Sequence, residues 1–106
     1  MSGIPCPKVK VYRNPRILAS ICWAPHCMGC GVVQEGQVVG AHSNRLEDGK
    51  GTGIKSHDVV AALCPTCHAF VDGKGDLESR HVFFLQAVYR TVLWMLRERI
   101  LEVSPI

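Results

Sequence analysis

The sequence predicts one small α+β domain that a zinc ion holds together. The chain has 106 residues, which fits a single domain with a modest core, so a metal staple would add useful stability. Two Cys-x-x-Cys pairs, at residues 27–30 and 64–67, offer four ligands. Apolar patterns around them indicate a β-hairpin, a short strand, a short helix and a long C-terminal helix.

The compartment decides how cysteines are used. The N-terminal segment shows no apolar signal-peptide core, and charges interrupt every long apolar stretch. We therefore expect a cytoplasmic protein without membrane contact. Thiols stay reduced there, which favours metal binding over disulfides. A redox role for either pair is disfavoured, because no thioredoxin-like βαβ pattern surrounds them. The chain has six cysteines in all: Cys6, Cys22, Cys27, Cys30, Cys64 and Cys67.

The first cysteine pair predicts a zinc knuckle. Cys27 and Cys30 are followed by Gly31, and a glycine tolerates the sharp backbone bend that lets two thiolates bind one ion. Cys22 is an alternative partner for Cys30, although the two-residue spacing favours Cys27. Cys6 lies between two prolines and reads as a spare thiol.

The second pair follows a predicted strand, residues 59–63, and opens a predicted helix, residues 65–72. Pro65 suits the first helical position, and Gly73 ends the helix. His68 directly follows Cys67, so about 100° of helical rotation separates the two side chains. His68 should therefore face away from the zinc, either to bind a second ion or as a packing or supporting residue.

The remaining elements are predicted from apolar patterns and turn residues. Residues 32–42 predict a β-hairpin whose second strand ends at His42. Residues 77–103 predict a helix that supplies most of the core. Its apolar residues cover a wide part of its circumference and could support a homodimer. Prolines make residues 1–20 a basic arm with at most one short helical or extended piece, which leaves residues 21–106 as the folded domain.

The charge is modest. A formal net charge of +3 excludes a strongly basic protein. The basic residues of the arm could contact phosphates or keep the arm soluble. Residues 43–58 form a glycine-rich loop that could contact phosphates or simply be solvated. Its glycines do not have the spacing of a Walker (P-loop) motif. Its candidate nucleic-acid-binding residues are Arg45, Lys50 and Lys55.

Three motifs together resemble the HNH nucleases of the ββα-metal, or His-Me finger, class. They are Cys27-x-x-Cys30, Ala41-His42 and Leu63-Cys64-Pro-Thr-Cys67-His68. The stretch AHSNRLEDGKGTGIKSHDVVAALCPTCHAFVDGK is similar to the pattern of a family of small nucleases encoded by phages and prophages. The resemblance implies a treble-clef or ββα-metal core, in which zinc joins the hairpin to the short helix.

The resemblance also implies metal-dependent hydrolysis of DNA phosphodiester bonds, during phage replication or recombination in the bacterial host or infected cell. His42 would be the general base, and His68 would bind a catalytic divalent ion such as Mg²⁺ or Mn²⁺. Asp58, or otherwise His57, stands where the pattern usually has asparagine and would orient the base or bind the ion.

A second departure from the family pattern supports a different hypothesis. Many members carry an acidic metal ligand directly before the base, where this chain has Ala41. The ion would then depend on His68 with Asp58, Asp72 or water. The alternative is a non-catalytic zinc module that recognises nucleic acid or a protein partner.

Overall fold

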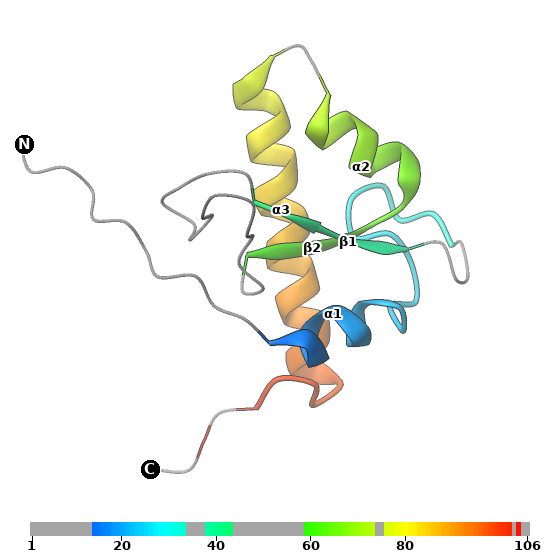
Figure 1. Cartoon of the computed structure of the whole chain (residues 1–106), viewed down its shortest axis with the longest axis vertical. Coiled ribbons are helices and arrows are strands. Elements are labelled where there is room, and N and C mark those ends of the chain that lie inside the picture. The colour runs from blue at the N-terminus through cyan, green and yellow to red at the C-terminus, as the bar shows by residue number, and fades with distance from the viewer. Residues whose placement is uncertain (1–13, 34–37, 44–58, 74–75, 103, 105–106) are drawn as a thin grey trace, which may run out of the picture.

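The protein is an α+β unit built along one long helix (Figure 1). The computed structural model describes residues 14–33, 38–43, 59–73, 76–102 and 104. The two strands cross the middle of the long helix, with one short helix near each of its ends (Figure 1). The predicted α+β class and the long C-terminal helix are thus confirmed. In chain order the elements are α1 (Pro15–Ile21), β1 (Val39–His42), β2 (Val60–Leu63), α2 (Pro65–Asp72) and α3 (Leu77–Arg97).

The sheet consists of β1 and β2 in antiparallel register, from Val39 opposite Leu63 to His42 opposite Val60. The hairpin predicted within residues 32–42 is wrong in its strand pairing. Residues 32 and 33 lie outside any strand, and residues 34–37 lie outside the described residues. β2 is buried along its whole length and is the better apolar partner for β1. The carbonyl of Val32 instead accepts the N–H of Cys27, at 2.9 Å.

The second edge of β2 is closed by two other parts of the molecule. The N–H of Ala62 donates to the hydroxyl of Thr91 in α3 at 3.1 Å, and its carbonyl accepts the N–H of Met28 at 2.8 Å. The Thr91 hydroxyl donates in turn to the carbonyl of Ala87 at 2.7 Å. The edge therefore leaves no unpaired backbone group at Ala62, and it fixes α3 and the first cysteine segment to the same strand.

Helix α1 changes the predicted extent of the N-terminal arm. Pro15 begins the helix, as proline can at a first helical position, and the side chain of Asn14 accepts the N–H of Arg16 at 3.1 Å. Ile17 and Ile21 are buried in the core. Residues 15–20, assigned to the arm from their prolines, thus belong to the packed part. Residues 1–13 lie outside the described residues.

Helix α3 begins as expected but ends at Arg97, earlier than the predicted residue 103. Asp76 caps its start, and the hydroxyl of Ser79 lowers the pKa of that carboxyl. Arg99 adopts a left-handed φ of 59° at the other end. The N–H groups of Arg99 and Ile100 donate to Leu96 and Met95 at 3.2 and 2.8 Å, which is the Schellman pattern. The apolar pattern continues to Ile100 because the chain turns back after the helix and packs this side chain against the core.

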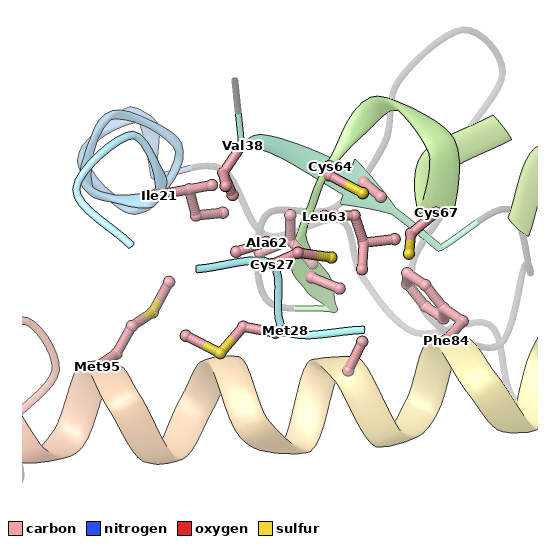
Figure 2. Close-up of a cluster of buried hydrophobic side chains, with 14 of the residues drawn as sticks. Ile21, Cys27, Met28, Val38, Ala62, Leu63, Cys64, Cys67, Phe84 and Met95 are labelled. Carbon is pink, nitrogen blue, oxygen red and sulfur yellow. The ribbon is translucent and has the colours of Figure 1, made fainter. Parts of the chain in front are cut away.

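Every described helix and strand contributes to one core. Figure 2 shows side chains from α1, the cysteine segments and α3 meeting around β2. Residues Ala61, Ala62 and Leu63 of β2 have no exposed surface, so this strand is the centre of the molecule. Among the described residues, no helix is both long enough and apolar enough to cross a membrane.

Candidate metal centre

Four cysteine sulfurs meet between the start of α2 and the segment that follows α1. Cys27, Cys30, Cys64 and Cys67 place their Sγ atoms within 4.8 Å of one another. Figure 2 shows three of these cysteines: Cys27 lies on the segment after α1, and Cys64 and Cys67 lie at the start of α2. No other group of three or more potential metal ligands occurs among the residues that the structure describes. Cys22 is exposed and lies outside the cluster, after the last turn of α1.

The first half of the site is a tight loop, which we call the knuckle (residues 27–31). The Sγ of Cys27 accepts the N–H of Gly29 at 3.3 Å and that of Cys30 at 3.5 Å. The N–H of Gly31 donates to the carbonyl of Cys27 at 2.9 Å. Gly31 has a φ of 82°, a conformation that side chains disfavour, so the bend predicted at this glycine is confirmed.

The knuckle is anchored to α3 by a residue that the sequence analysis did not identify. The guanidinium of Arg90 donates through Nη1 to the carbonyls of Met28 at 3.1 Å and Gly29 at 3.4 Å. Gly29 itself lies against α3, because a Cβ there would be 2.6 Å from the ring of Phe83. Arg90 sits in a mostly apolar helix, but only the fold shows which carbonyls it reaches.

The second half of the site is built on regular structure. Cys64 follows the buried strand β2 and is the N-cap of α2, and Pro65 starts the helix. The N–H of His68 donates to the carbonyl of Cys64 at 2.9 Å, which places Cys67 in the first helical turn beside it. Gly73 caps the helix as predicted, and a Cβ there would be 2.9 Å from the carbonyl oxygen of Ala69.

The cluster has the size that a tetrahedral metal site needs. Zn–S bonds of about 2.3 Å imply sulfur–sulfur separations of about 3.8 Å. The Sγ atoms of Cys30 and Cys64 are 3.9 Å apart. Cys27, Cys64 and Cys67 are buried, whereas Cys30 is exposed. Four thiolates complete a tetrahedron, so the cluster could hold a structural metal such as zinc.

Electrostatics within the cluster favour a bound cation. Burial raises the pKa of Cys27, but N–H groups of Cys30, Cys64 and Gly29 outweigh it and lower the pKa to about 6. Burial and the neighbouring cysteine sulfurs raise the pKa of Cys67. One thiolate is therefore favoured in the cluster alone, and a divalent cation would supply the charge that stabilises the others.

The other predicted site residues fall into three groups. His42 ends β1 opposite Val60 and is half-buried, at the end of the sheet away from Leu63, after which α2 begins. His68 in α2 places its Nε2 atom 3.0 Å from Oδ2 of Asp72, and both side chains are partly exposed. The remaining ones lie outside the described residues: Asp58, Arg45, Lys50 and Lys55.

Comparison with known proteins adds no relative. No protein-family model matches the sequence. No curated protein and no solved structure shows significant similarity to it.

Proposed function

We propose that the four cysteines bind zinc and that the surrounding elements form a treble clef. The knuckle supplies two ligands, the β1–β2 sheet follows it, and the N-cap and first turn of α2 supply the other two. Thiolates in a compact tetrahedral set suit Zn²⁺ better than harder cations, which prefer oxygen ligands. Because the protein supplies all four ligands, the ion stabilises the fold and takes no part in chemistry.

On this zinc-bound unit we propose a metal-dependent endonuclease that hydrolyses phosphodiester bonds of DNA. The observation that carries the proposal is the pair of His68 and Asp72 on α2, whose nitrogen and oxygen atoms lie 3.0 Å apart. One helical turn separates the two residues, and both are partly exposed. They offer one imidazole and one carboxylate to a divalent ion such as Mg²⁺ or Mn²⁺.

The reaction assigns the remaining residues by role. His42 accepts a proton from a water molecule, whose oxygen then attacks phosphorus. His68 and Asp72 would hold the divalent ion, which would supply stabilisation of the negative charge on phosphorus and on the oxygen that leaves as the phosphorus–oxygen bond breaks. Asp58 orients the base or completes the ion's ligands, and basic residues at positions 45, 50 and 55 contact phosphates. The setting would be the cytoplasm of a bacterium that carries a phage or prophage.

A second candidate is a non-catalytic zinc module that binds nucleic acid or a protein. One observation favours it: the register of β1 puts His42 at the end of the sheet opposite to the start of α2, which carries His68. Ala41, buried directly before His42, offers no acidic ligand. In this case the zinc would hold a binding surface in place, and the histidines would have structural roles.

Nicking of supercoiled plasmid DNA separates the two candidates. The protein is tested with Mg²⁺, with Mn²⁺ and without added metal, alongside the variants His42→Ala and His68→Ala. His81→Ala, a histidine of α3 that the mechanism does not use, is the matched control. Zinc content and circular dichroism establish that each variant is folded.

The nuclease proposal predicts nicking that requires added metal, survives His81→Ala and is lost in the other two variants. Metal-independent nicking, or nicking that persists in His42→Ala and His68→Ala, would contradict it. DNA binding without nicking, unchanged by both substitutions, would support the non-catalytic module.

A further inference from the structure

Helix α3 has a second apolar face that the core does not use. Its buried face consists of Phe84, Ala87, Thr91 and Met95. On the other side of the helix, Tyr89 is 65% exposed, Val82 48%, Leu96 44% and Leu85 43%. Val92 and Leu93 are half-buried beside them. We call this set the second apolar face: Val82, Leu85, Tyr89, Val92, Leu93 and Leu96.

The spacing of this face is that of a helix that packs against another helix. Positions 82, 85, 89, 92 and 96 alternate steps of three and four residues, which is the heptad pattern of a coiled-coil seam. A surface helix of a monomer normally carries polar residues opposite its core face. Between residues 82 and 97, the exposed charged and amide side chains form a narrow strip of Gln86, Arg90 and Arg97. The face spans about 21 Å at 1.5 Å per residue, enough for several interhelical layers.

We propose that the occupant of this face is the same face of a second copy, packed antiparallel about a two-fold axis at Tyr89. Four of the other five residues of the face are symmetric about Tyr89 in sequence, and Val92 alone has a polar counterpart, Gln86. Val82 and Leu96 lie equally far from it on either side, and so do Leu85 and Leu93. The two-fold therefore brings Val82 against the partner's Leu96, and Leu85 against the partner's Leu93. Such self-complementarity is what an isologous dimer requires.

The charges at the ends of α3 favour the same orientation. Glu78 lies in the first turn and Arg97 in the last turn. An antiparallel pair places Glu78 near the partner's Arg97, whereas a parallel pair would place like charges together. Antiparallel helices also align their dipoles favourably. This inference goes beyond the proposed function, since zinc binding and catalysis do not require it.

The molar mass in solution tests the dimer. The 11.7 kDa chain should behave as a dimer in sedimentation or light-scattering measurements on the zinc-bound protein. Tyr89→Glu places two carboxylates at the axis and should give a monomer with unchanged zinc content and helicity. Val33→Glu, at a side chain that is 70% exposed and lies outside α3, is the matched control and should stay dimeric. A monomeric wild type, or a Tyr89→Glu variant that remains a dimer, would overturn the proposal.

Cysteine cross-linking tests the orientation. In a Cys6→Ser, Cys22→Ser background, Tyr89→Cys should form a disulfide-linked dimer under mild oxidation, because this position meets itself at the axis. Val82→Cys and Leu96→Cys should each fail to link alone but should link when the two variants are mixed. Self-linking of Val82→Cys and of Leu96→Cys, without linking between them, would indicate a parallel pair and would overturn the antiparallel geometry.

Discussion

The two halves of the metal centre are held by different means. Cys64 and Cys67 sit where a buried strand passes into a helix, and their backbone positions follow from regular hydrogen bonds and from burial. Cys27 and Cys30 sit on a loop that depends on N–H contacts to a sulfur, on two carbonyls held by Arg90 and on one contact to Ala62. The fold alone therefore places Cys64 and Cys67 more firmly than Cys27 and Cys30.

This difference assigns a specific task to the metal. An ion bound by all four cysteines would connect the loop to the centre of the molecule through bonds that no side chain in the knuckle can replace. Its binding energy would go mainly into ordering residues 27–31 against β2 and α2. We therefore expect the knuckle to loosen before β2 does when the metal is removed.

Metal removal should have the largest effect. Structural zinc is worth about 10–16 kcal/mol in small zinc-finger peptides, so chelation should lower the free energy of unfolding here by several kcal/mol. Hydrogen exchange should accelerate more at the amides of Met28 and Gly31 than at the amide of Ala62, which Thr91 holds. Equal acceleration at all three would contradict the proposed division between the halves.

Cysteine substitutions sharpen the same test. Cys30→Ser should lower zinc stoichiometry and reproduce the exchange pattern of the chelated protein. Cys22→Ser is the matched control, since this cysteine is exposed and lies outside the cluster. A zinc stoichiometry that falls equally in both variants would mean that Cys22 contributes a ligand.

How much could be predicted from the sequence differs between the halves as well. Cys64, Pro65 and Gly73 carry local signals for a strand end, a helix start and a helix stop, and the element bounds match. The knuckle bend at Gly31 was also readable, because it depends on a single residue's φ. Local patterns could not show that residues 39–42 pair with residues 60–63, because that choice depends on long-range burial.

The same limit applies to α1 and to Arg90. Prolines near the N-terminus suggested an arm, yet Pro15 begins a helix whose Ile17 and Ile21 enter the core. Arg90 was missed because its two carbonyl partners are distant in sequence. The roles given to His42, His68 and Asp58 rest on the motif resemblance and stay predictions.

The next largest loss of stability should come from substitution of Thr91, which hydrogen-bonds to β2 and so supports the half of the centre that contains Cys64 and Cys67. Thr91→Val removes the hydroxyl and leaves the buried N–H of Ala62 without its acceptor. An unsatisfied buried donor costs about 1–3 kcal/mol, and chemical denaturation should show a loss of about 2 kcal/mol. Thr91→Ser keeps the hydroxyl and should retain most of the stability that the valine variant loses. A Val variant as stable as wild type would show that this contact does not support β2.

A comparable but smaller loss is expected in the knuckle from Gly29→Ala. The added Cβ would lie 2.6 Å from the Phe83 ring and 3.1 Å from Leu63, so one of them must shift. Overpacking costs about 1–3 kcal/mol, and the partly exposed Phe83 ring can move, so about 1–2 kcal/mol is expected by denaturation. Phe83→Leu should relieve part of that cost in the double variant. If the stability losses of the two single variants simply add in the double variant, the Cβ added at Gly29 does not clash with the Phe83 ring.

The smallest loss of stability should come from substitution of Arg90. This substitution should affect the knuckle and leave the half that contains Cys64 and Cys67 unchanged. Arg90→Gln shortens the side chain and removes the charged donor from the carbonyls of Met28 and Gly29. Hydrogen bonds from charged groups contribute about 1.5–3 kcal/mol, and solvent exposure reduces this to about 1 kcal/mol here. The loss should appear as faster exchange at Met28 with little change at His68, whose amide belongs to α2. Arg97→Gln on the same helix is the control and should leave both amides unchanged. Faster exchange at both sites in Arg90→Gln would mean that the knuckle and α2 open together, and that the metal centre behaves as one cooperative unit.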